Sequence, residues 1–191
     1  MVGGTRIYFL RHLATASNNR GHIQGRTDEP VALYEPIDFP PGFEIPRLTL
    51  LTSTLMRCRQ SAGVLLGQVA VSSEGTIVDY QTLNSLVERD CGELTGRSKS
   101  SLLADHPDWF CGTSLKPGFT PPGGESIDDL LRRVRGVVPK IHAAAAHSTV
   151  VVCSHRQTLR ALKCEMEGLD AMAAWSSLEF PNGKLVALGS A

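Results

Sequence analysis

The stretch that decides the fold is Ile7 to Asn19, IYFLRHLATASNN. Its first four residues are apolar or aromatic and are typical of a buried strand. Arg11 and His12 follow at once, and then comes a polar, small-residue segment that cannot continue the strand. The sequence therefore predicts a buried strand that ends in two titratable side chains.

Two further apolar runs, Leu48–Leu51 and Thr149–Cys153, repeat this pattern, because polar residues and then a helical periodicity follow each of them. The helical positions are Leu55, Cys58, Ala62, Leu65 and Leu66 after the first run, and Leu159, Leu162, Met166 and Leu169 after the second. Strands that alternate with amphipathic helices are typical of an α/β fold. We therefore predict a parallel sheet that these helices cover.

A third helix is predicted in the C-terminal half, where Ser126 can cap it, Asp129 gives a capping-box variant, and Pro139 should kink or end its first half. Two Pro/Gly-rich segments, 28–46 and 107–124, show little periodicity and are long for connections inside a compact domain. Loops of that length are usually lids, binding loops or disordered, and we expect both at the active site. Their aromatic side chains would line it: Tyr34, Phe39, Phe43, Trp109, Phe110 and Phe119.

Length and composition predict a single domain that spans residues 1–191. A chain of 191 residues with 42% hydrophobic side chains can build one sizeable core but not two. Nineteen basic and nineteen acidic residues are interspersed and cancel, which argues against nucleic acid and membrane as partners. No signal-peptide core or membrane-spanning window is present, so we expect a cytoplasmic protein. Five cysteines without a C-x-x-C pair indicate neither a disulfide framework nor a zinc knuckle.

Ligands of open α/β sheets bind beyond the carboxyl ends of the strands, and this chain concentrates cations and histidines there. The predicted strand ends and the helical turns after them deliver Arg11, His12, Thr52, Ser53, Arg57, Ser154, His155 and Arg156. Two histidines and several arginines are therefore expected at one rim of the sheet.

These residues, in this order, resemble the histidine phosphatase superfamily, the phosphoglycerate-mutase-like proteins. The matching segments are RHLATASN (11–18), IQGRTD (23–28), STLMRCRQSA (53–62), ERDCGELTG (88–96), PPGGES (121–126), VVVCSH (150–155) and FPNGKLVAL (180–188). They come in the family's order and span nearly the whole chain. The resemblance implies a single three-layer α/β domain with a mostly parallel central sheet flanked by helices.

The resemblance also implies hydrolysis of a phosphomonoester through His12, whose neutral imidazole would attack phosphorus and form a phosphohistidine. Arg11, Arg57 and a protonated His155 would keep the pKa of His12 low and would bind the phosphate. Glu88 would protonate the leaving group and then deprotonate the attacking water. The sequence shows no metal-ligand spacing, so we expect neither a metal nor another cofactor.

Substrate contacts and two departures from the family pattern lie near the same rim. Asn18, Gly25 and Lys99 resemble the family's substrate-contacting positions, although a turn or a surface position would also explain them. The family glycines after the two histidines are Leu13 and Arg156 here. Leu13 either accepts the glycine conformation or points away and narrows the pocket. Arg156 could add a substrate-binding cation or reach solvent.

The remaining polar residues are expected to be structural. His22, His106, His142 and His147 match no family position, and we expect Arg132, Arg133 and Arg135 to form a solvated helix face. Prolines exclude the family's helix over much of 28–46, which leaves a loop that could shape one side of the site.

Our prediction is a metal-independent phosphatase that acts on a small phosphorylated metabolite. A phosphoglycerate-type mutase shares the pocket, but such mutases usually carry a longer tail than the 36 residues that follow His155. A non-catalytic phospho-ligand-binding domain would need the cations but not Glu88. The sequence does not name the substrate, and an edge strand near Gly183–Leu188 could pair across a dimer.

Overall fold

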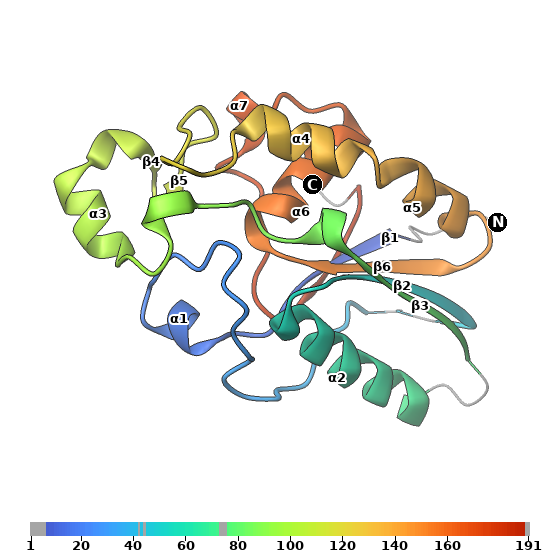
Figure 1. The fold of residues 1–191 in the computed structure, drawn as a ribbon. Helices are drawn as coiled ribbons and strands as arrows, with labels where there is room; N and C mark the ends of the chain where they lie inside the picture. Colours follow the sequence, from blue (N-terminus) through green and yellow to red (C-terminus); the bar gives the residue numbers. More distant parts are fainter. Residues whose placement is uncertain (1–6, 42, 44, 73–75, 190–191) are drawn as a thin grey trace.

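A five-stranded sheet forms the centre of the computed structural model, which describes residues 7–41, 43, 45–72 and 76–189 (Figure 1). The strand order is β3 (Ile77–Leu83), β2 (Arg47–Ser53), β6 (Thr149–Ser154), β1 (Ile7–Arg11) and β7 (Leu185–Ala187). Four strands are parallel, and β7 runs antiparallel to β1 at the edge. The three predicted strands are thus confirmed, and they occupy the middle of the sheet.

Helices cover both faces of the sheet and make three layers (Figure 1). One face carries α2 (Met56–Ser72), and the other carries α4 (Ile127–Arg135), α5 (Val138–Ala145) and α6 (Arg156–Glu167). The central strands are buried on both faces: Val150 and Val152 of β6 lie in one core, while Val151 and Cys153 lie in the other. This alternation explains the continuous apolar runs in the sequence, because a strand covered on both faces needs no polar side.

The helix boundaries follow local chemistry. Ser126 caps α4 by accepting a hydrogen bond from the Asp129 amide at 3.1 Å, as predicted. Pro139 lies in the first turn of α5, where its missing N–H costs nothing, so the predicted break falls between the two helices. Gly168 ends α6 with a φ of 66°, which places Leu169 beyond the helix and not on its buried face as expected.

Several elements are not among those predicted from the sequence. They are α1 (Ala16–Asn19), β3, α3 (Lys99–Asp105), the hairpin of β4 (Phe110–Cys111) and β5 (Ser114–Leu115), α7 (Ala171–Ala174), and three short 3-10 turns, Asn84–Leu86, Gly92–Leu94 and Pro107–Trp109. Most of the side chains of β3 are exposed. An edge strand with this pattern carries little of the apolar signal that identifies buried strands.

The 28–46 loop packs against the α2 face of the sheet. Val31 and Ile37 are buried in the core on that face, and their amides donate to the side chains of Gln60 and Gln68 of α2. The described part of this loop contains no helix, which agrees with the proline argument. Within the part of the chain that the structure describes, no helix has the length and apolarity needed to cross a membrane.

Candidate active site

The carboxyl ends of β1, β2 and β6 bring the predicted residues together. Arg11 ends β1 and His12 follows it, whereas His155 follows β6 and forms the N-cap of α6. Arg57 lies in the first turn of α2, which follows β2. The imidazole rings of His12 and His155 are 5.2 Å apart between their centroids. The fold therefore joins two histidines that are far apart in sequence.

His12 is held as a neutral imidazole with one free nitrogen. Its side chain is almost fully buried, and Nδ1 lies 2.6 Å from the main-chain oxygen of Leu13. Because a carbonyl oxygen can only accept, the proton is assigned to Nδ1, and Nε2 keeps its lone pair. Burial, Arg57 and Arg11 hold the pKa of His12 well below its usual value. This ring can act as a nucleophile at neutral pH.

His155 is also neutral, which corrects the expectation that it is protonated. The Nε group of Arg57 donates to its Nδ1 at 3.2 Å, so this nitrogen must accept. Its Nε2 lies 2.9 Å from the hydroxyl oxygen of Ser53 and is the nitrogen left to carry the proton. Burial, then Arg57 and His12, hold the pKa of His155 well below its usual value.

The two candidate arginines are placed differently. Arg57 is fully buried, and its Nη2 donates to the oxygen of Gly25 at 2.9 Å while its Nη1 donates to the oxygen of Thr27. Arg11 lines an open pocket; its Nη1 donates to the oxygen of Phe180, and its buried Nε has no partner among the described residues. Burial and the charge of Arg156 lower the pKa of Arg11 to about 10.

Glu88 lines the same pocket as Arg11 and His12. Its Oε1 accepts hydrogen bonds from the amides of Arg89 at 2.9 Å and Thr158 at 3.3 Å, and from the Thr158 hydroxyl at 3.2 Å. These three donors all bind the same carboxyl oxygen and thereby fix the orientation of the Glu88 side chain. The site thus combines a neutral imidazole, a cation and a carboxyl group.

Arg133 holds the segment that carries Glu88, and this corrects its assignment to a solvated face. Its Nη1 donates to the oxygens of Ser85 and Val87, each at 2.9 Å. Its Nη2 pairs with Glu125 at 2.8 Å, and both side chains are largely buried. Arg132 and Arg135 are exposed, as expected.

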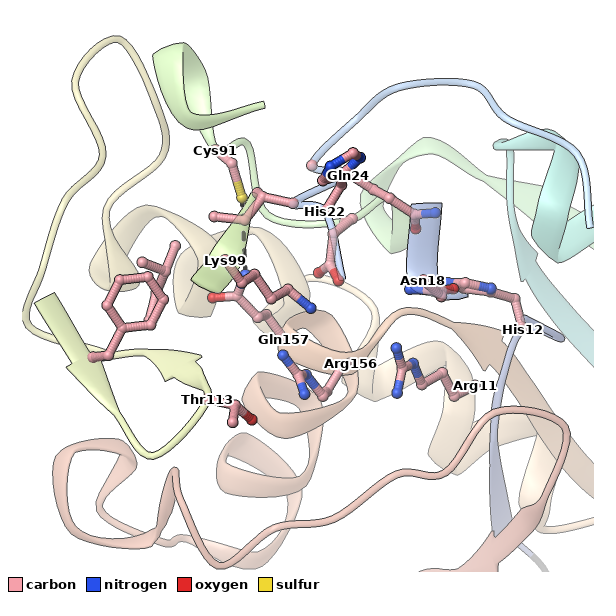
Figure 2. A pocket seen from close by; sticks show the side chains of 15 residues that line it. Arg11, His12, Asn18, His22, Gln24, Cys91, Lys99, Thr113, Arg156 and Gln157 are labelled. Atoms are coloured by element: carbon pink, nitrogen blue, oxygen red, sulfur yellow. Dashed lines mark hydrogen bonds between the residues drawn. The ribbon is translucent and has the colours of Figure 1, made fainter. Parts of the chain in front are cut away.

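The pocket takes in all four predicted substrate-binding positions, Asn18, Gly25, Lys99 and Arg156 (Figure 2). The other lining residues are His22, Ile23, Gln24, Cys91, Phe110, Thr113, Leu115 and Gln157. The motifs predict no role for His22, although its position between two matched motifs marks it as a candidate. Arg57 and His155 do not line this pocket, although the His155 ring lies beside that of His12.

The two predicted active-site loops differ. The second, 107–124, lines the pocket through Phe110, Thr113 and Leu115. The described residues of the first, 28–46, do not line it, because this loop covers the α2 face instead. Of the aromatic side chains expected at the site, Phe110 alone among those described lines the pocket. The first loop touches the site through Glu29, which accepts a hydrogen bond from the pocket residue Gln24 at 2.9 Å.

Leu13 does not obstruct the pocket. Its side chain is buried in the core on the α2 face, and no described non-glycine residue has a positive φ, so Leu13 needs no glycine conformation. Its amide donates to the hydroxyl of Ser61 at 2.8 Å. Space for its side chain comes from Gly183, where a Cβ atom would lie 2.8 Å from Leu13 Cδ2. The main-chain oxygen of Leu13 contacts His12 in the site, whereas the Leu13 side chain packs in the core.

No group of three or more histidine, cysteine, aspartate or glutamate side chains in the described ranges is arranged to hold a metal ion. The cysteines are unpaired; Cys58, Cys91, Cys153 and Cys164 are buried, and Cys111 is exposed. Burial raises the pKa of Cys91, the thiol in the pocket, to about 12. Cys91 is therefore a thiol at neutral pH and not a nucleophile.

The fold and the site together define an α/β protein with a histidine–arginine–carboxyl pocket at the carboxyl ends of its parallel strands. The sequence model of the histidine phosphatase superfamily (branch 1) matches residues 42–190. The chain belongs to this superfamily. The matched segment begins after Arg11 and His12, so their placement beside the matched part of the site rests on the structure.

Curated relatives include both mutases and phosphatases. A 2,3-bisphosphoglycerate-dependent phosphoglycerate mutase of Methylobacterium radiotolerans is 31% identical over 138 residues, which are 67% of this chain and 58% of the relative. Phosphoserine phosphatase 1 of Hydrogenobacter thermophilus is 29% identical over 92 residues, 48% of this chain and 44% of that protein. This chain thus spans about half the length of these two relatives.

Solved structures share the fold. The α-ribazole phosphatase from Shigella flexneri superimposes with a TM-score of 0.68 at 19% identity, covering 93% of this chain and 86% of that one. A mycobacterial glucosyl-3-phosphoglycerate phosphatase has a TM-score of 0.68 at 21% identity, covering 92% and 86%. At these identities the likeness shows the fold alone, and it confirms the phosphoglycerate-mutase-like architecture.

Proposed function

We propose that this protein hydrolyses a small phosphomonoester through a phosphohistidine at His12, without a metal ion. The observation that carries the proposal is the state of His12. Its imidazole is neutral, it holds its proton on Nδ1 against the oxygen of Leu13, and it faces a pocket that also contains Arg11 and Glu88. A polar residue that only ended a strand would need none of these features.

In the first step, the lone pair of His12 Nε2 attacks phosphorus. The bond between phosphorus and the ester oxygen breaks, and that oxygen takes a proton from the carboxyl group of Glu88 and leaves as an alcohol. The products are a phosphohistidine and a Glu88 carboxylate. Arg11 binds the phosphoryl oxygens, and Arg57, which is hydrogen-bonded to His155, contributes its charge.

In the second step, water attacks the phosphohistidine and Glu88 takes its proton. The bond between phosphorus and Nε2 breaks, the electron pair returns to His12, and inorganic phosphate leaves. Glu88 then carries a proton for the next cycle. His155 contributes as a neutral ring. Its Nε2 can donate to the hydroxyl of Ser53, and its Nδ1 accepts from Arg57 and keeps that side chain in place.

Two alternatives remain as outcomes of the test. The mutase reading draws support from the 31% identical phosphoglycerate mutase. The replacement of two family glycines would favour a binding domain, but Leu13 leaves the pocket unobstructed and Arg156 adds a cation to it. A carboxyl group is of no use to a domain that only binds phosphate, so Glu88 in the pocket favours catalysis.

The test is phosphate release from a panel of phosphomonoesters in excess chelator. We expect release by the wild type and none by His12→Ala, whereas His147→Ala, which removes an exposed histidine, keeps the wild-type rate. Transfer of phosphate between the hydroxyls of phosphoglycerate without release would favour the mutase. Binding of phosphate esters without turnover of any of them would favour the binding domain.

A further inference from the structure

The pocket carries more positive charge than one phosphoryl group needs. Arg11, Lys99 and Arg156 all line it. Figure 2 shows Arg11 between His12 on one side and Arg156 and Lys99 on the other, so the cations extend away from the nucleophile. Arg156 stands in the first turn of α6, directly after His155, where the family has glycine.

The charge of Arg156 acts on this outer end of the pocket. After burial, Arg156 and then Arg11 are the main causes that lower the pKa of Lys99, to about 8. Arg156 also lowers the pKa of Arg11, but the cations that lower the pKa of His12 are Arg57 and Arg11. Arg11 is therefore shared between the two ends, while Lys99 and Arg156 belong to the outer one.

Among the described residues, these two outer cations have no acidic side chain within ion-pair distance. Arg133 pairs with Glu125, and Arg160 pairs with Glu179. In contrast, neither the Lys99 ammonium nor the Arg156 guanidinium makes a hydrogen bond or ion pair with any described residue. Two half-buried like charges that face one cavity repel each other, and an anion between them would relieve this repulsion.

Given the proposed phosphatase activity, we propose that Lys99 and Arg156 form a second anion subsite, so that the preferred substrates carry a carboxylate or a second phosphate beyond the phosphoryl group at His12. Arg156 is the specificity-determining residue of this subsite, since its fork of N–H donors matches a carboxylate or phosphate edge. Thr113 and Gln157 lie near Arg156 in Figure 2, and Phe110 and Leu115 add apolar surface to the lining of the pocket. A short substrate with an anion at each end fits this arrangement.

A matched pair of substrates tests the subsite. 3-Phosphoglycerate and glycerol 3-phosphate share a three-carbon frame and a terminal phosphate, but only the first has a carboxylate. We expect the wild type to have a higher kcat/KM for 3-phosphoglycerate. Arg156→Gln should reduce this preference about 10- to 100-fold, as the loss of a charged hydrogen bond does. Arg59→Gln removes a charge from the exposed face of α2 and should leave the preference unchanged.

Two results would overturn the subsite. If Arg156→Gln lowered kcat/KM equally for both substrates, Arg156 would act on the transferred phosphoryl group. If it lowered neither, Arg156 would only reach solvent. Glycerol 1,3-bisphosphate, compared with glycerol 3-phosphate in the same way, shows whether the second anion is a phosphate and not a carboxylate.

A binding measurement separates this proposal from the proposed function. Calorimetric titrations of His12→Ala, which cannot form a phosphohistidine, should show tighter binding of 3-phosphoglycerate than of glycerol 3-phosphate, and the added Arg156→Gln change should abolish the difference. This result would support the subsite even if the wild type hydrolysed neither compound. Equal affinities for both compounds in His12→Ala would refute the subsite even if the enzyme were an active phosphatase.

The pH dependence gives a second readout. The charged groups that act on Lys99 are Arg156, Arg11 and Glu88, with Cys91 as a thiol. Because Lys99 loses its proton near pH 8, the wild-type preference for 3-phosphoglycerate should fall as the pH rises through this range. Lys99→Arg keeps its charge and should retain the preference there. An identical fall in both proteins would exclude Lys99 from the subsite.

Discussion

The Nδ1 atom of His12 lies 2.6 Å from the main-chain oxygen of Leu13, the residue that replaces a family glycine. This contact orients the ring and fixes its tautomer, and it needs no particular side chain at position 13. The Leu13 side chain is free to fill the core on the α2 face. The change from glycine to leucine therefore preserves the main-chain oxygen that orients His12.

The tautomer of His12 is open to direct observation. With its pKa held well below 6.5, His12 should be neutral at pH 6.5, where an ordinary histidine is half protonated. Nitrogen-15 NMR of the imidazole rings should show Nδ1 protonated and Nε2 bare, with the signal assigned from its loss in His12→Asn. A doubly protonated ring at this pH would contradict the nucleophilic role.

Glu88→Gln tests the proton donor. We expect kcat/KM for an alkyl phosphate to fall roughly a hundred- to ten-thousandfold, because the alkoxide must then leave without a proton. For 4-nitrophenyl phosphate the fall should be much smaller, since its leaving group is a weak base. Equal losses for both substrates would indicate a structural role for Glu88.

Arg133 is expected to act as a positioning residue for Glu88. Arg133→Gln removes its bonds to Ser85 and Val87 and its pair with Glu125, at a cost of about 1–3 kcal/mol in the free energy of unfolding. The activity loss should show the same dependence on the leaving group as Glu88→Gln. Arg132→Gln, which changes the exposed neighbour, is the matched control. A loss of stability with no such dependence would limit Arg133 to a structural role.

Leu13 and Gly183 should be energetically coupled. Gly183→Ala places a Cβ 2.8 Å from Leu13 Cδ2 and requires alanine to adopt a φ of 69°. We expect a loss of about 1–3 kcal/mol in the free energy of unfolding. In the Leu13→Ala background the steric part of that loss should disappear, and denaturant unfolding should give a coupling of about 1 kcal/mol. Additive losses would mean that Gly183 does not make the space for Leu13.

The sequence predicts the three central strands because they are buried on both faces and therefore read as uninterrupted apolar runs. It does not predict β3, whose exposed edge position leaves no such run. The same limit applies to the 28–46 loop: its prolines exclude a helix, but only the packing of Val31 and Ile37 shows which face it covers.

The sequence also predicts that the site residues meet at one rim of the sheet, because parallel strands end at the same edge. It does not predict their protonation, because the neutral state of His155 depends on which nitrogen Arg57 faces. Arg133 escapes prediction for a related reason. Its main-chain acceptors lie 45 to 48 residues away in sequence, and no local pattern links them to Arg133.

The most direct test of the central claim is to trap the phosphoenzyme. The wild type is mixed with its best substrate, quenched within one turnover in alkaline denaturant, where phosphohistidine survives, and digested for mass spectrometry. We predict that the peptide containing His12 gains the mass of one HPO₃ group, that mild acid removes it, and that His12→Ala shows neither the adduct nor phosphate release. Phosphate release without an adduct on His12, or release that persists in His12→Ala, would contradict the account.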